Sequence, residues 1–120
     1  MARILIVDDE PDILLMLRMG LEDEGHDVFM AADGEMALAR IAEHSPDLVV
    51  LDLMMPVLDG YGVLERLQAD GGSAMPVVVV SAKAESADID RALGLGAREF
   101  VSKPFDLDRL VALVASTLGA

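Results

Sequence analysis

Five short runs of mainly aliphatic residues constrain the fold of this chain more than any other feature. They lie at 4–7, 28–31, 48–51, 77–80 and, with more polar character, 99–101. The first, third and fourth are wholly aliphatic, which is typical of strands buried on both faces. Between the runs, apolar residues recur at helical spacing, as at Ile13, Leu17 and Leu21. Strand and helix thus alternate five times, which predicts an α/β fold with a doubly wound, five-stranded parallel sheet and five helices.

The size and charge of the chain exclude several classes of function. Its 120 residues suit one domain, which we expect to span residues 1–120. Asp and Glu number 22 against 9 Lys and Arg, and the net charge of −13 would repel nucleic acid and anionic membranes. The chain has no cysteine, and its first residues are too polar for a signal peptide or a membrane span. We therefore expect a soluble, cytoplasmic protein that contacts neither DNA nor membrane directly.

Polar residues stand where the predicted strands end. Asp8 and Asp9 follow the first strand, Asp52 the third and Ser81 the fourth, and Lys103 comes soon after the fifth. Ligand sites of doubly wound sheets lie outside the carboxyl ends of the strands, so these side chains should converge. Two carboxylates roughly 5 Å apart repel by about 3 kcal/mol at an effective dielectric of about 20, and one lysine cannot offset three of them. Because carboxylate, carbonyl and water oxygens are the ligands of Mg²⁺, the pattern predicts a site for Mg²⁺ and a phosphoryl group.

Each of these residues also has an ordinary interpretation. Asp9, shortly before a proline, could cap the first helix. Ser81 could belong to a turn, and Lys103 could be a solvated charge. Asp52 has fewer alternatives, because Asp59 is the better cap for the next helix and leaves Asp52 without a local backbone role. The placement of all these residues at strand ends favours the functional interpretation.

Four segments of the chain carry a family resemblance. In order, they are ILIVDDEPD, SPDLVVLDLMMPVLDGYG, VVVVSAK and FVSKPFD. Over its whole length the chain resembles the receiver domains of bacterial two-component response regulators. This resemblance implies a flavodoxin-like fold, as in chemotaxis response regulators, with strand order 2-1-3-4-5.

The resemblance also implies how the acidic residues act. Asp52 would be the phosphoacceptor. Asp9 and Asp52 would bind Mg²⁺ directly and Asp8 would bind it through water. The backbone carbonyl of Met54 would complete the protein ligands.

By the same resemblance, Lys103 would contact a phosphoryl oxygen, and a cis bond between Lys103 and Pro104 would aim it at the site. The chemistry would be covalent catalysis by a carboxylate. The domain would catalyse only its own phosphoryl transfer and its own dephosphorylation, so we expect no enzyme that acts on an external substrate.

Two further pairs of residues receive roles from the resemblance. Ser81 and Phe100 would be switch residues, the hydroxyl of Ser81 moving toward the phosphoryl group. Phe100 stands where the family often has tyrosine; its ring has no hydroxyl for a partner, and it could equally be an ordinary core aromatic. Met54 and Lys83 would flank the path of the hydrolytic water and set the lifetime of the phosphoryl group.

The family's partners follow from this chemistry. The phosphoryl group would come from a phosphohistidine on a sensor histidine kinase or, in a phosphorelay, on a histidine phosphotransfer protein. It would shift the population of an output surface formed by the fourth helix, fifth strand and fifth helix, for a downstream effector protein or domain. The resemblance also allows a phosphorylation-dependent homodimer. The first helix has more apolar residues than one buried stripe needs, so we expect some, such as Leu15 or Met19, to be exposed. A phosphodonor could dock on these residues, or they could have no partner.

Three other functions share this fold class. A phosphatase of the haloacid dehalogenase type would need an acid two residues after its nucleophile, where this chain has Met54. A flavodoxin would need a phosphate-binding loop after the first strand, where the acidic DDEPD would repel the flavin phosphate. A phosphate-independent protein-interaction module usually lacks an acidic or lysine position. All of these positions are kept here, so this module is retained only as the alternative.

Overall fold

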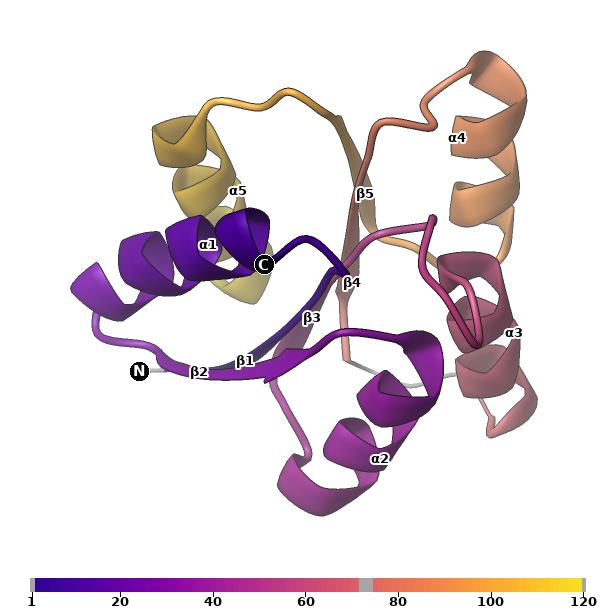
Figure 1. Ribbon diagram of the computed structural model, residues 1–120, viewed down its shortest axis with the longest axis horizontal. Coiled ribbons are helices and arrows are strands. Elements are labelled where there is room, and N and C mark those ends of the chain that lie inside the picture. Colours follow the sequence, from indigo (N-terminus) through magenta and orange to yellow (C-terminus); the bar gives the residue numbers. More distant parts are fainter. Residues whose placement is uncertain (1, 72–74, 120) are drawn as a thin grey trace.

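Strands and helices alternate along the chain in the computed structural model, which describes residues 2–71 and 75–119 (Figure 1). The strands are β1 (Arg3–Val7), β2 (Asp27–Ala31), β3 (Leu48–Leu51), β4 (Val77–Ser81) and β5 (Glu99–Ser102). The helices are α1 (Pro11–Asp23), α2 (Gly34–His44), α3 (Gly60–Ala69), α4 (Ser86–Gly94) and α5 (Leu107–Gly119). All strand pairs are parallel and the order is β2-β1-β3-β4-β5. The predicted fold and strand order are confirmed.

The aliphatic runs form the strands because both faces of the sheet are covered. Leu48, Val49 and Leu51 in β3 and Val78 and Val79 in β4 are fully buried. Two strands are one residue longer at their carboxyl ends than the apolar pattern predicts. The reason is that the polar residues there, Ser81 and Ser102, still pair across β4 and β5.

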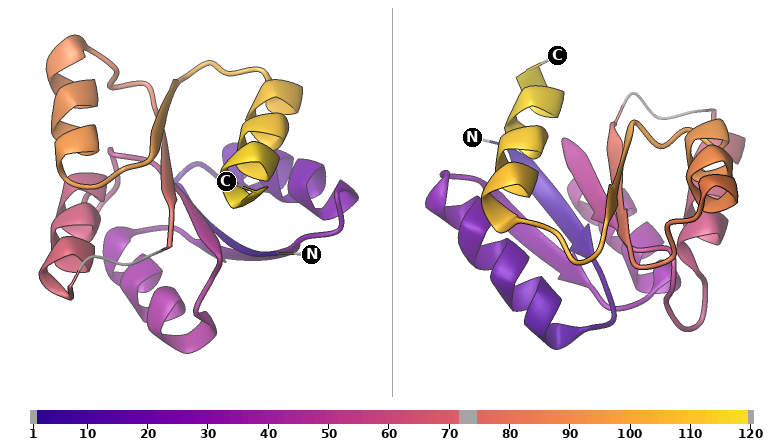
Figure 2. Two further views of the ribbon diagram at one scale, coloured as in Figure 1. Left: turned by 180° about the vertical axis from the view of Figure 1, so that it is seen from behind. Right: turned by 90° about the horizontal axis from the view of Figure 1, so that it is seen from above.

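The sheet separates two hydrophobic clusters, because successive strand residues point to opposite faces. Leu5 packs with residues of α2, α3 and α4, among them Tyr61. Ile4 and Ile6 pack on the other face with residues of α1 and α5, such as Leu17. Figure 2 shows this division, with α1 and α5 together on one face of the sheet and the remaining helices on the other.

Helix α1 is apolar beyond its buried stripe, as expected. Leu17 and Leu21 are buried, whereas Leu15 and Met19 are 58% and 59% exposed. Within the described part of the chain, no helix has both the length and the apolar character needed to cross a membrane.

Candidate functional site

The acidic residues predicted at the strand ends do converge. Strands β1 and β3 are neighbours in the sheet, so Asp8, which follows β1, lies beside Asp52, which follows β3. One carboxylate oxygen from each of Asp8, Asp9, Glu10 and Asp52 lies within 4.8 Å of the others. Asp8 and Asp52 are only 2% and 4% exposed, whereas Asp9 and Glu10 face solvent. Glu10 was not predicted, although it directly follows the two aspartates in the sequence. We call these four residues the acidic cluster.

Lys103 reaches into the acidic cluster from the loop after β5. Its Nζ donates hydrogen bonds to Asp8 Oδ2 at 2.8 Å, to Asp52 Oδ2 at 3.0 Å and to Glu10 Oε1 at 3.2 Å. Its side chain is only 10% exposed, so this lysine is not a solvated surface charge. The Lys103–Pro104 bond is cis, as the resemblance implies. The predicted meeting of acids and lysine is therefore present.

One lysine does not satisfy the buried carboxylates. Burial raises the pKa of Asp8, and neighbouring Asp52 raises it further, while hydrogen bonds from Lys103 and the Glu10 amide only partly oppose this. Burial alone would lower the pKa of Lys103, but the hydrogen bonds and charges of Asp8 and Asp52 outweigh burial and raise it. The ammonium is thus held in its charged form, and the carboxylates still lack positive charge.

Short-range hydrogen bonds hold the carboxylates in place. Asp8 Oδ1 accepts from the Glu10 amide at 2.9 Å, and Asp52 Oδ1 accepts from the Met54 amide at 3.2 Å. The expectation that Asp52 has no local backbone role is therefore wrong. The N-cap of α1 is Glu10 rather than Asp9, so Asp9 does not have the capping role considered for it. The metal-binding role of the Met54 carbonyl stays a prediction.

The two predicted switch residues lie on the strands beside the site. Ser81, the last residue of β4, is fully buried, and its Oγ accepts a hydrogen bond from the Lys83 amide at 3.2 Å. The Lys103 amide donates to the Ser81 carbonyl at 3.0 Å, which joins the β4 end to the lysine loop. Phe100 is half-buried in β5 against the cluster under α2, α3 and α4. Their switching roles stay predictions.

Gly60 sets the distance between α3 and the loop that begins at Asp52. Asp59 caps α3 by accepting the Gly62 amide at 2.8 Å, as its sequence position predicts. The Gly60 amide donates to the Leu53 carbonyl at 3.0 Å. A β-carbon on Gly60 would collide with the backbone carbonyl oxygen of Asp52 and lie 2.7 Å from Leu53 Cα. Only glycine lets the helix approach the Asp52 backbone this closely.

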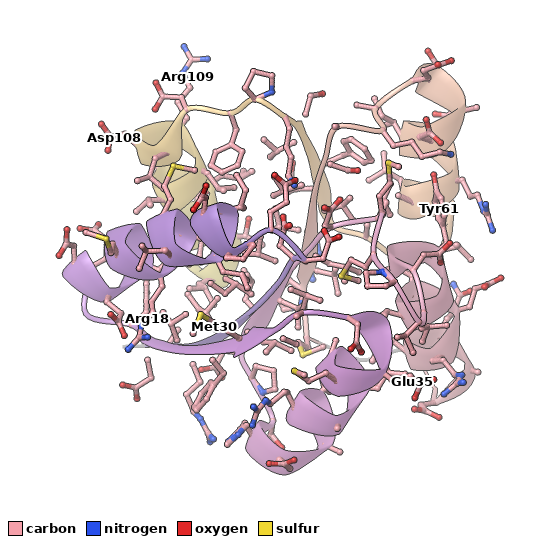
Figure 3. All side chains as sticks on the ribbon, in the orientation of Figure 1. Arg18, Met30, Glu35, Tyr61, Asp108 and Arg109 are labelled. Carbon is pink, nitrogen blue, oxygen red and sulfur yellow. The ribbon has the colours of Figure 1, made fainter. Side chains whose placement is uncertain are left out.

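A second polar group, which we call the Tyr61 cluster, joins α3 to α4 and was not predicted. Asp88 Oδ1 accepts from Tyr61 Oη at 2.9 Å and from Lys83 Nζ at 2.7 Å. The Arg91 guanidinium lies 3.9 Å from the centre of the Tyr61 ring. Tyr61 is labelled in Figure 3, where α3 approaches α4. No spacing rule could have found this cluster, because Tyr61 and Asp88 are 27 residues apart and belong to different helices.

The donor chemistry of the acidic cluster fits a hard cation. Four carboxylates meet a single ammonium, so the described residues carry an excess of negative charge at one point. Oxygen ligands of this kind suit Mg²⁺ or Ca²⁺, which commonly bind through carboxylates and water. The site is an acidic pocket that could bind a metal ion.

Comparisons with known proteins identify the family of the chain. Residues 4–115 match the sequence profile of the response regulator receiver domain, so the chain belongs to the response regulator receiver-domain family of two-component signalling. It is 43% identical to the response regulator GtcR of Aneurinibacillus migulanus over 115 residues, covering 96% of this chain and 47% of that protein. It is also 43% identical to the DNA-binding response regulator MtrA of Mycolicibacterium smegmatis, over 97% of this chain and 50% of that protein.

Solved structures show the same fold. The receiver domain of Francisella response regulator 1452 superimposes with a TM-score of 0.93 at 30% identity, covering 99% of this chain and 98% of that one. The Vibrio cholerae chemotaxis protein CheY4 has a TM-score of 0.89 at 27% identity, covering 97% and 98% of the two chains. The chain spans about half the length of the curated relatives it matches.

Proposed function

We propose that the chain takes a phosphoryl group onto the Asp52 carboxylate in a Mg²⁺-dependent reaction and later loses it to water. The observation that carries this proposal is the meeting of Asp52 with Asp8, Asp9 and Lys103 at one edge of the sheet. Asp52 is one of the two buried carboxylates of this group, and its Oδ1 accepts a hydrogen bond from the Met54 amide. Its oxygen can therefore act as a positioned nucleophile.

In the transfer, an Asp52 carboxylate oxygen forms a bond to phosphorus while the bond from phosphorus to the donor histidine nitrogen breaks. The Lys103 ammonium, already within 3.0 Å of Asp52 Oδ2, binds a phosphoryl oxygen and offsets its charge. Asp8, Asp9 and Asp52 would hold Mg²⁺, whose chemical contribution is to neutralise charge on the phosphoryl oxygens. The domain acts only on itself, so it is not an enzyme with an external substrate.

The proposed donor is a sensor histidine kinase or a histidine phosphotransfer protein. The proposed output is a change at the surface of α4, β5 and α5, read by an effector protein or domain. Asp108 and Arg109 are exposed at the start of α5 and point outward from this surface (Figure 3). Support comes from the receiver-domain match together with relatives named as DNA-binding or transcriptional regulators, of which this chain covers about half.

Intact mass after incubation with acetyl phosphate and Mg²⁺ tests the proposal. We expect the wild type to gain one phosphoryl group, and we expect no gain for Asp52→Asn or in EDTA. Asp90→Asn, an exposed position on α4, is the control for loss of one carboxylate. A folded wild type that gains no mass would favour the phosphate-independent interaction module instead.

A further inference from the structure

The Tyr61 cluster and the acidic cluster border a shared open hollow of about 620 Å³. On one side the hollow is lined by Asp9 and Met54, which belong to the acidic cluster and its loop. On the other side it is lined by Tyr61, Lys83 and Arg91. The hollow beside the acidic cluster therefore has the half-exposed side chain of Lys83 on its lining.

Asp88 decides where the ammonium of that lysine lies. Lys83 Nζ donates to Asp88 Oδ1 at 2.7 Å and lies 5.6 Å from the centre of the Tyr61 ring, although the lysine side chain is 48% exposed. The lysine side chain has a flexible stem of four carbons, so the ion pair with Asp88 selects one of many possible positions for the ammonium. The hydrogen bond with Asp88 raises the pKa of Lys83, so the group stays charged.

Asp88 itself is firmly positioned. Its Oδ1 also accepts from Tyr61 Oη at 2.9 Å, and its Oδ2 accepts from the Glu85 amide at 3.2 Å, which closes the capping box of α4. The Asp88 side chain is only 13% exposed and Tyr61 is 5% exposed. Two donors other than Lys83 thus fix the Asp88 carboxylate, the Tyr61 hydroxyl from α3 and the Glu85 amide at the N-cap of α4, and that carboxylate fixes Lys83.

The alternative place for the Lys83 ammonium is the opposite side of the hollow, beside Asp9 and Met54. Lys83 follows Ser81 by two residues, and its amide is hydrogen-bonded to Ser81 Oγ. A phosphoryl group on Asp52 would add negative charge beside Asp8 and Asp9, which would attract an unpaired ammonium. In the wild type, Asp88 competes with that attraction.

We propose that Asp88 is a positioning residue that keeps the Lys83 ammonium away from the acidic side of the hollow and so leaves the phosphoryl group on Asp52 open to water. This inference rests on the proposed function. In the hydrolysis, a water oxygen bonds to phosphorus and the bond from phosphorus to the Asp52 oxygen breaks. The Asp52 carboxylate is regenerated; one water proton stays on the inorganic phosphate and the other goes to solvent. A freed Lys83 would occupy the approach of that water and hold the phosphoryl oxygens.

The test measures the rate of phosphoryl loss by intact mass, after loading with acetyl phosphate and Mg²⁺ and removing the donor. We expect Asp88→Asn to slow the loss about fivefold, equivalent to about 1 kcal/mol in the barrier. The double variant Lys83→Met with Asp88→Asn should lose the phosphoryl group at the rate of Lys83→Met alone, whereas Lys83→Arg with Asp88→Asn should stay slow. A purely structural role of Asp88 would not depend on the charge at position 83.

Two further variants keep the outcomes distinct. Asp90→Asn repeats the charge change at an exposed position on the same helix and should keep a rate near that of the wild type. Tyr61→Phe removes one donor to Asp88 but retains the Asp88 carboxylate and Lys83, so it should slow the loss less than Asp88→Asn. If Asp88→Asn does not fold, Asp88→Ser retains an acceptor for the Glu85 amide and takes its place. Equal rates of phosphoryl loss for the wild type and the Asp88 variants, or slowing that persists without Lys83, would overturn the inference about Asp88 but not the proposed function. No phosphoryl uptake by the folded wild type would overturn the proposed function.

Discussion

Two lysines, Lys103 and Lys83, lie in the loops that follow neighbouring strands, and the structure uses them differently. The Lys103 ammonium is shared by three carboxylates and its side chain is 10% exposed. The Lys83 ammonium has Asp88 as its ion-pair partner and its side chain is 48% exposed. A buried charge cannot leave its partners without a large cost in desolvation, whereas an exposed one can exchange partners easily. Lys103 is therefore suited to a fixed role in the site, and Lys83 to one that changes.

The largest expected effect in this comparison comes from Lys103→Met. Without the ammonium, buried Asp8 and Asp52 face each other uncompensated, so we expect a loss of about 3 kcal/mol in the free energy of unfolding at neutral pH in EDTA. Urea unfolding measures it. Because a bound metal ion would supply positive charge at the same point, saturating Mg²⁺ should reduce the loss. An equal loss with and without Mg²⁺ would contradict the assignment of the metal to these carboxylates.

Gly60→Ala tests how closely the acidic cluster and the Tyr61 cluster are joined, because Gly60 lies between Asp52 and Tyr61. Its methyl group would collide with the backbone of Asp52 and Leu53, so α3 or the loop must move. We expect a loss of about 1–3 kcal/mol in the free energy of unfolding, the range for overpacked sites. Phosphoryl uptake should slow as well. Gly94→Ala is the matched control, because a β-carbon there meets open space. If Gly94→Ala lost as much free energy of unfolding as Gly60→Ala, close packing at Gly60 would not explain the loss.

What could be predicted from the sequence depended on local signals. The aliphatic runs gave the strands, and the rule that ligand sites lie at the carboxyl ends of strands brought Asp8, Asp9, Asp52 and Lys103 together correctly. The cis bond before Pro104 came only from the family resemblance, since base rates alone would have favoured trans.

The remaining features depend on tertiary packing. The hydrogen bond between Tyr61 and Asp88 exists only because α3 and the start of α4 lie side by side in the folded chain. The error over Asp52 has a different cause: its hydrogen bond to the Met54 amide spans only two residues, and a loop conformation rather than a helix cap produces it.

Asp8→Asn should show that the buried site lacks positive charge in the absence of metal. The pKa of Asp8 is raised above 3.8 in the folded state, chiefly by burial. The folded state therefore binds this proton more tightly than the unfolded state. The stabilisation of the folded state by the protonated Asp8 carboxyl is fully present below pH 3.8 and is lost as pH rises through the raised pKa. In EDTA, Asp8→Asn should remove this decline and raise the urea midpoint at neutral pH; a lower midpoint at neutral pH would contradict the sign of the shift.

The smallest expected effect on stability is that of Lys83→Met, and it separates the two lysines most clearly. Because the ammonium is exposed, we expect the urea midpoint to stay near that of the wild type.

The effect of Lys83→Met should appear instead on Asp88, whose pKa is lowered chiefly by its hydrogen bond from Lys83 and next by that from Tyr61. A lowered pKa contributes stability that is present above 3.8 and is lost as pH falls through the folded-state value, so the variant should lose part of that pH dependence. Carboxyl NMR titration of Asp88 should give a higher pKa in Lys83→Met than in the wild type, and a smaller rise in Tyr61→Phe. An unchanged Asp88 pKa in Lys83→Met would mean that the two groups are not paired in solution, and Lys83 would then have no fixed position for Asp88 to control.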